Sequence, residues 1–400
     1  YFSPTSRYGT ARDLMELVDK CHQAGIGVIM DFVPIHFATD YYGLANYDGT
    51  QLYEYVQSDV TDSEWGTRNF DYSRREVCCF LQSAANYWLK EYHFDGIRMD
   101  AISRAIYWQG EPERGVNPCA ISFIRNMNAG LQKLHPSAML IAEDSTAFPK
   151  VTAPVEYDGL GFDYKWDLGW MNDTLNYFKT PPQERAEHYY QLKFSMDYFY
   201  NELYLLALSH DEAVHGKATI IQKMWGGYED KFRQCRALYL YMMTHPGKKL
   251  NFMGNEIAQF REWDERRQQD WELLKFPMHD GFYHYVRTLN ELYCRENILY
   301  EKEYDRERFR WLVDDAKEQS VYVYERGKGE NTLVAAFNFS KEKQECVIEK
   351  LLKCEKLTEI LNSDWDIYGG ETCKKKEIIC NGKIVLAPFS GRIFWKEHIS

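Results

Sequence analysis

The sequence contains no long apolar run. None of its hydrophobic segments approaches the roughly 20 residues that a membrane-spanning helix needs. It also contains no block of like charge, and its formal net charge is −12 over 400 residues. An acidic chain of this kind does not favour nucleic acid as a partner. No signal peptide opens the sequence, so we expect a cytoplasmic protein that binds neither nucleic acid nor membranes.

Paired cysteine motifs are also missing. The ten cysteines are scattered, and those near the C-terminus do not have the C-x-x-C spacing of a zinc site. We therefore expect free thiols in a reducing compartment and no metal centre. The cysteines of the C-terminal region are Cys346, Cys354, Cys373 and Cys380.

Aromatic residues, by contrast, are abundant. They make up 16% of the chain and include 30 Tyr and 11 Trp. Flat rings with polar edges can stack on the faces of sugars, although much of this content must belong to the core. The other proportions are those of a globular protein, and the length suggests two or three domains.

Helical and strand patterns alternate along the first 299 residues. Each strand pattern is a short apolar run, and most are followed by a segment with apolar residues at helical spacing. This order predicts a parallel sheet with crossover helices, and we count six such units. An eight-stranded (β/α)8 TIM-type barrel needs two more, so we expect a barrel that lacks its first two strands, with a short excursion at about 37–72. The predicted strands are residues 27–33, 94–100, 139–142, 159–163, 203–208 and 249–253.

From about residue 300 the pattern changes to short alternating strands separated by turns. We predict strands over residues 320–324, 332–339, 345–348 and 383–386. Such a series indicates an antiparallel β-sandwich, which we assign to residues 300–400. This region shows no acid–base constellation, so we expect it to support the barrel.

Four of the predicted barrel strands end in acids: Asp31, Asp100, Glu143 and Asp211. Arg98 lies two residues before Asp100, and alternate residues of a strand share a face. A salt-bridged strand end would explain one such pair. Four clustered carboxyl groups are costly, however, because like charges raise one another's pKa. Two carboxyl groups flanking a glycosidic bond are the minimum for glycoside chemistry.

Two further residues have both a functional and a structural interpretation. His36 follows the first predicted strand and could bond a sugar hydroxyl, although a lone His more often serves a structural hydrogen bond. Trp65 lies in an aromatic excursion of the kind that forms a pocket rim, and local packing explains it equally well.

The order of these motifs resembles the four motif regions of the α-amylase clan, glycoside hydrolase family 13. Other segments resemble its bacterial glycogen-branching group. The clan motifs are Asp31-Phe-Val-Pro-Ile-His36, Gly96-Ile-Arg-Met-Asp-Ala101, Ala142-Glu-Asp144 and Leu208-Ser-His-Asp211. The branching-group segments are residues 4–10, 159–173, 209–217 and 246–256.

The resemblance implies the role of each residue. Asp100 would be the nucleophile, Glu143 the general acid and base, and Asp211 the stabiliser of the transition state. The other residues that we expect to bind substrate are Asp31, His36, Arg98, His210, Trp65, Tyr164 and Trp166. A glucan-binding module and two barrel strands are expected upstream of Tyr1.

The implied activity is cleavage of an α-1,4-glucan and transfer of the freed segment to a 6-hydroxyl, as in glycogen synthesis. The substrate would be glycogen or amylose, the protein a monomer, and no metal or organic cofactor would be required. One alternative is an α-glucan hydrolase of the same clan, an amylase or a debranching enzyme, in which water ends the reaction. Another is a non-catalytic glucan-binding protein, which the presence of all three carboxyl groups disfavours.

Overall fold

A computed structural model describes residues 1–329, 331–348, 355–380 and 382–398, so Cys354 lies outside the described residues. The chain divides into two compact units. The first comprises Tyr1–Trp166 with Asn201–Leu203, and the second comprises Asp167–Tyr200 with Tyr204–Ser400. The predicted domain boundary near residue 300 stays a prediction. Among the described residues, no helix combines the length and the apolar character needed to cross a membrane.

The first unit is built around parallel strands in the order β1-β4-β5-β6. Asp31 is in register with Arg98, and Met99 with Ala142. The carboxyl ends of these strands therefore meet at one edge. The strands are β1 (Ile29–Phe32), β2 (His36–Phe37), β3 (Arg68–Asn69), β4 (Gly96–Met99), β5 (Met139–Ala142) and β6 (Tyr164–Trp166). The helices are α1 (Ala11–Gln23), α2 (Ser58–Thr61), α3 (Arg75–Glu91), α4 (Ser103–Ile106) and α5 (Pro118–Leu134).

The apolar spacing of residues 10–24 predicts a helix that Thr10 and Asp13 begin with a capping box, and α1 confirms both the helix and the box. The Thr10 hydroxyl accepts from the Asp13 amide at 3.3 Å, and the Asp13 carboxylate accepts from the Thr10 amide at 2.7 Å. Two of the amides that a helix start leaves unpaired are thereby satisfied. The helix ends before Gly25, whose φ of +73° suits a residue without a Cβ.

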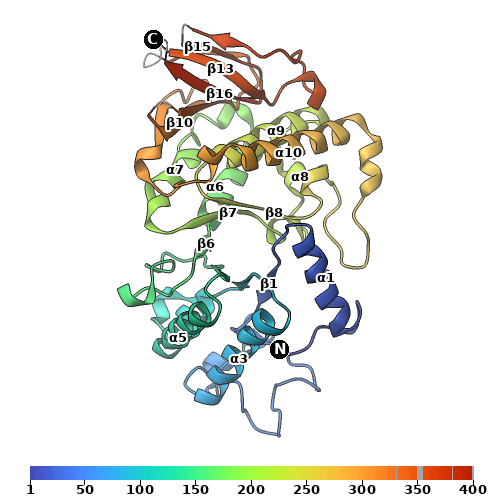
Figure 1. The fold of residues 1–400 in the computed structure, drawn as a ribbon, viewed down its shortest axis with the longest axis vertical. Helices are drawn as coiled ribbons and strands as arrows, with labels where there is room; N and C mark the ends of the chain where they lie inside the picture. Colours follow the sequence, from blue (N-terminus) through green and yellow to red (C-terminus); the bar gives the residue numbers. More distant parts are fainter. Residues whose placement is uncertain (330, 349–354, 381, 399–400) are drawn as a thin grey trace. The chain divides into compact units, whose positions relative to one another are not determined.

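Helices α3 and α5 lie side by side in the first unit (Figure 1). Their buried faces share one hydrophobic cluster with strands β4 and β5, in which Ile97 and Leu140 are fully buried. Gly96 allows β4 to approach β5 closely, because a Cβ at this position would lie 2.4 Å from the Met139 carbonyl oxygen. The paired strands that bear the predicted acids are therefore fixed by tight packing.

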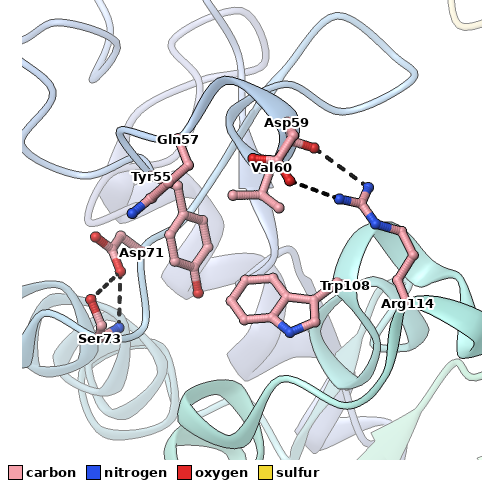
Figure 2. Close-up of a pocket in the computed structure, with 8 residues that line it drawn as sticks. All are labelled: Tyr55, Gln57, Asp59, Val60, Asp71, Ser73, Trp108 and Arg114. Carbon is pink, nitrogen blue, oxygen red and sulfur yellow. Dashed lines mark hydrogen bonds and ion pairs between the residues drawn. The ribbon is translucent and has the colours of Figure 1, made fainter.

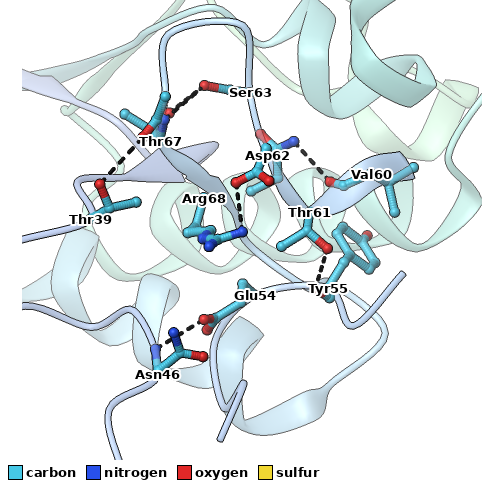
Figure 3. A network of polar contacts seen from close by, with 12 residues as sticks. Thr39, Asn46, Glu54, Tyr55, Val60, Thr61, Asp62, Ser63, Thr67 and Arg68 are labelled. Carbon is cyan, nitrogen blue, oxygen red and sulfur yellow. Dashed lines mark hydrogen bonds and ion pairs between the residues drawn. The ribbon is translucent and has the colours of Figure 1, made fainter. Parts of the chain in front are cut away.

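The excursion at about residues 37–72, after β1, is held by a network of polar contacts (Figure 3). Strand β2 pairs with β3, and Arg68 forms an ion pair with Asp62 at 2.6 Å. The Glu54 carboxylate is fully buried and accepts from the Asn46 amide at 3.0 Å. The Thr61 hydroxyl donates to the Tyr55 carbonyl oxygen at 2.7 Å. These bonds order a segment that contains little regular secondary structure.

The strand predicted over residues 159–163 is wrong in position, since β6 begins at Tyr164. Gly161 has a φ of +79°, and a Cβ on Gly159 would lie 1.9 Å from the Ala153 carbonyl oxygen. The Leu160 carbonyl instead accepts from the Asn128 side chain of α5 at 2.8 Å. The segment is therefore a loop packed on a helix, and the strand follows it.

The second unit contains parallel strands β7 and β8, followed by antiparallel strands in the order β14-β13-β16-β11-β10-β9. A hairpin of β12 and β15 forms another sheet. Its helices are α6 (Leu168–Lys179), α7 (Gln191–Tyr198), α8 (Ile220–Lys223), α9 (Tyr228–Thr244) and α10 (Pro277–Arg295). Its strands are β7 (Tyr204–Leu208), β8 (Lys248–Asn251), β9 (Phe309–Val313), β10 (Val321–Lys328), β11 (Asn331–Asn338), β12 (Gln344–Val347), β13 (Glu355–Asn362), β14 (Ile378–Ile379), β15 (Lys383–Leu386) and β16 (Ser390–His398).

The two C-terminal sheets enclose a small core that includes Val323, Ile384 and Phe394. This is the predicted β-sandwich, although β9, β13, β14 and β16 were not predicted. The other face of the larger sheet lies over α9 and α10 (Figure 1). There the buried Arg236 guanidinium donates to the Ser363 carbonyl oxygen at 2.7 Å. The sandwich and these helices thus share one interior.

Candidate active site

Arg98 is the centre of a cluster of carboxyl groups in the first unit. Its side chain is only 5% exposed, and one guanidinium nitrogen lies 2.9 Å from Asp100 Oδ1 and 3.3 Å from Asp31 Oδ1. The other terminal nitrogen forms an ion pair with Glu143. The two terminal nitrogens of one guanidinium therefore bind Asp100 and Glu143, which are two of the three predicted catalytic residues. Such charge-assisted bonds fix geometry as well as charge.

The backbone brings these side chains together through the strand ends. The Asp100 amide donates to the Phe32 carbonyl at 3.1 Å, and the Glu143 amide donates to the Met99 carbonyl at 3.0 Å. Ala101 then turns the chain sharply with a φ of +46°, and its amide donates to the Glu143 carboxylate at 3.3 Å. Left-handed backbone at a residue with a Cβ is strained, and such strain is concentrated at functional sites.

Glu143 has an altered protonation equilibrium. Burial raises its pKa to about 7, the positive charge of Arg98 opposes the rise, and the negative charge of Asp100 adds to it. A carboxyl group with this pKa can give and take a proton near neutral pH. This is the property that a general acid and base of glycoside chemistry requires.

Trp166 lies behind Arg98. The guanidinium carbon is 4.2 Å from the centre of the indole ring, and the tryptophan is 4% exposed. This is a cation–π contact, which orients the cation over the ring face. Next to it in the chain, the buried Lys165 ammonium lies 2.7 Å from the Asp144 carboxylate and ties β6 to the residue after Glu143. Contact of Trp166 with substrate stays a prediction.

His36 and Trp65 lie together on the excursion, with ring centres 5.1 Å apart. Arg104 covers the Trp65 ring at 4.6 Å and forms an ion pair with Glu64 at 2.8 Å. Burial is the main cause that lowers the pKa of His36, and the nearby charge of Asp100 opposes it. A neutral imidazole near Asp100 is suited to bonding a sugar hydroxyl.

His210 and Asp211 belong to the second unit and lie just after β7, separated from it by Ser209. The His210 imidazole lies 3.5 Å from the Asp211 carboxylate, and both side chains are partly exposed. Ser209 fixes this turn, because its hydroxyl donates to Glu212 at 2.7 Å and accepts from the Asp211 amide at 3.2 Å. The predicted strand end is therefore observed, and the role of Asp211 stays a prediction.

The structure thus brings together Asp31, Arg98, Asp100, Glu143 and Trp166, and separately pairs His36 with Trp65. Tyr164 begins β6, where its backbone pairs with Ile141. Sequence reasoning did not single out Arg104, Lys165 or Asp144 as functional residues, because their importance depends on contacts between distant segments. Among the described residues, no group of three or more His, Cys, Asp or Glu side chains is arranged to hold a metal ion.

Comparison with known proteins finds two matching domain families and similar solved folds. Residues 1–51 match the catalytic domain of alpha amylase, and residues 311–394 match the alpha amylase C-terminal all-beta domain. Two solved alpha-amylases, from Anoxybacillus and from Geobacillus thermoleovorans, superpose with TM-scores of 0.70 at 19% identity. The alignments cover 98% and 100% of this chain, and 80% and 83% of those chains. These superpositions show the fold of an alpha-amylase, which confirms the predicted fold class.

The sequence is also similar to bacterial 1,4-alpha-glucan branching enzymes. It is 46% identical to GlgB of Bacillus caldolyticus over 92% of this chain and 56% of that protein. It is 44% identical to GlgB of Bacillus cereus (strain G9842) over 97% of this chain and 60% of that protein. The chain therefore spans somewhat more than half the length of these relatives.

Proposed function

We propose that the protein is a 1,4-α-glucan branching enzyme that acts by a retaining double displacement. The observation that carries this proposal is the Arg98 cluster, in which one cation holds Asp100 and a Glu143 whose pKa is about 7. The similarity to GlgB proteins over more than nine-tenths of the chain supports transfer to a sugar hydroxyl.

In the first step, Asp100 attacks the anomeric carbon of an α-1,4-glucan. Glu143, protonated near neutral pH, gives its proton to the leaving oxygen, and the chain that bears the reducing end departs. The remaining segment stays attached to Asp100 as a glycosyl ester. Arg98 holds both carboxyl groups throughout, so neither has to be repositioned between steps. We assign Asp211 to the stabilisation of positive charge on the sugar ring.

In the second step, Glu143 takes a proton from the 6-hydroxyl of another glucan, and that oxygen displaces Asp100. Water competes at about 55 M, but a well-oriented bound group can reach an effective molarity of about 10⁵ M or more. An aromatic rim that binds the acceptor chain would therefore favour transfer. We assign Trp65, His36, Tyr164 and Asp31 to sugar contacts at this rim. We also assign His210 of the second unit to a sugar contact.

The deciding experiment supplies amylose to the full-length protein. Proton NMR counts new α-1,6 anomeric signals while a reducing-sugar assay follows the same sample. We expect branch signals with little rise in reducing ends. Reducing ends that rise in step with lost α-1,4 links, without branch signals, would identify a hydrolase instead.

Asp100→Asn is the matched inactive control. The amide is nearly isosteric with the carboxylate but cannot form the glycosyl ester, so turnover should be lost while the unfolding midpoint stays close to that of the parent. Appreciable activity in this variant would overturn the assignment of the nucleophile.

We further place the protein in the cytoplasm as a monomer, and the free state of the described cysteines supports that compartment.

A further inference from the structure

A pocket of about 500 Å³ lies in the first unit, lined by residues that do not belong to the Arg98 cluster (Figure 2). Its wall combines two aromatic rings, Tyr55 and Trp108, with the polar side chains of Gln57, Asp59 and Arg114. Its volume is within the range of small-ligand sites. The proposed reaction does not use this pocket.

The two rings form a fixed corner. Their centres are 5.6 Å apart with planes at 63°, so that one ring meets the other edge-on. The Tyr55 hydroxyl is held by the Asn117 side-chain amide at 3.0 Å, and Tyr55 is buried. Trp108 is only partly buried, which leaves part of its indole facing the pocket. A rigid, partly exposed indole is a surface on which the apolar face of a sugar can stack.

The polar groups of the pocket suit a neutral ligand with many hydroxyls. Arg114 forms an ion pair with Asp59 at 3.0 Å, which leaves its positive charge balanced. Asp71 accepts from the Ser73 hydroxyl at 2.6 Å and from Arg74 at 3.1 Å. The wall carries Asp59, Asp71 and Arg114, so its small net negative charge does not favour an anionic ligand, and its many polar groups do not favour an apolar one. Fixed donors and acceptors beside a ring are the groups that bind a sugar.

The pocket wall is bonded to the rim of the candidate active site through Gln109. The Gln109 amide donates to the backbone carbonyls of Asp59 at 3.0 Å and Asp62 at 2.8 Å. Its oxygen accepts from Arg104 at 2.8 Å, and the Arg104 guanidinium covers Trp65. One chain of contacts through Gln109 and Arg104 therefore connects the pocket wall to Trp65.

We propose that this pocket is a second binding site for an α-1,4-glucan, in which a short stretch of chain stacks on Trp108 and bonds to Gln57, Asp59 and Arg114. The inference rests on the proposed function for the identity of the sugar. The site holds a part of the glucan away from the bond that reacts. A glucan bound there stays on the enzyme for longer, and the chemical step is unchanged.

The test compares pocket variants of the full-length protein on amylose. Trp108→Ala and Arg114→Ala should each raise the KM for amylose about 3- to 10-fold, as expected for the loss of one stacking or polar contact, with a much smaller change in kcat. Trp271→Ala is the matched control, because Trp271 is an exposed tryptophan of the second unit outside the pocket, and its KM should equal that of the parent. An unchanged KM in both pocket variants would overturn the proposal.

A direct binding measurement separates this proposal from the proposed function. Isothermal titration with maltoheptaose in the Asp100→Asn background should show weaker binding when Trp108→Ala or Gln57→Ala is added. Gln57 is an exposed side chain, so its variant remains informative if the tryptophan variant fails to fold. Equal affinity with and without Gln57→Ala and Arg114→Ala would overturn the pocket as a glucan site, even where the parent makes branches. A parent that makes no branches would overturn the proposed function, and the titration would still decide the pocket.

Discussion

A carboxyl group can protonate a leaving oxygen only while it carries a proton, and burial keeps Glu143 protonated up to about pH 7. Its folded pKa is raised, so the active acid form is present below this value and is lost above it. We therefore expect kcat/KM for branching to fall about tenfold per pH unit above pH 7. Rates measured from pH 5 to pH 9 would show this limb.

The matched control for this pH profile is Glu156→Gln, which alters an exposed glutamate of the same unit and should leave the limb in place. A profile that stays flat to pH 9 would contradict the assignment of Glu143 as the acid.

Trp166 gives a second prediction at the scale of single residues. Because the indole supports the Arg98 guanidinium at 4.2 Å, Trp166→Leu should release the cation and disturb both carboxyl groups that it holds. A cation–π contact contributes about 0.5–2 kcal/mol, which corresponds to roughly a 2- to 30-fold loss in kcat. Trp166→Phe keeps a ring and should lose less.

The distinguishing readout is the pH profile of the Trp166→Leu variant. Because Arg98 opposes the rise in the Glu143 pKa, a displaced guanidinium should move the basic limb to higher pH. A variant with reduced kcat but an unshifted limb would show that Trp166 acts only in packing.

At the scale of elements, the strand pair β4–β5 depends on the missing side chain of Gly96. A Cβ there would lie 2.4 Å from the Met139 carbonyl oxygen, so Gly96→Ala must push two hydrogen-bonded strands apart. We expect a loss of about 1–3 kcal/mol in the free energy of unfolding, measured by urea denaturation. Gly130→Ala is the control: it lies exposed in α5 with nothing within 4 Å of the added Cβ, and should stabilise by about 0.5–1 kcal/mol. Equal effects of the two changes would contradict this account.

Elements with a strong local signal could be predicted from the sequence. Helix α1 has its cap and its period in adjacent residues, and it was predicted to within one residue at each end. Strands β9, β13, β14 and β16 were missed because their stability comes from pairing with distant strands, as β16 does with both β11 and β13. The acids at the strand ends were also predictable from local sequence. The ion pair between Arg98 and Glu143 was not, because these residues lie 45 positions apart and meet only through the register of their strands.

At the scale of the whole molecule, the C-terminal sandwich shares a hydrophobic core with the helices that precede it. Tyr324, Phe337 and Ile393 belong to the same buried cluster as Leu240 and Phe282. A protein cut at residue 299 should therefore expose this interior, and we expect it to aggregate or to bind a hydrophobic dye strongly. A soluble 1–299 fragment with a cooperative thermal transition would contradict this expectation.

The Arg98 cluster also determines which small molecules the site attracts. Three carboxyl groups surround one guanidinium, so the cluster carries a net charge of about −2 when Glu143 is ionised and about −1 when it is protonated. A sugar analogue with a protonated ring nitrogen carries its positive charge where the reacting sugar develops one. The excess negative charge should hold such an iminosugar more tightly than the neutral sugar of the same shape, and more tightly still as the pH rises through 7. The same imbalance should therefore make the proposed enzyme selectively sensitive to cationic inhibitors.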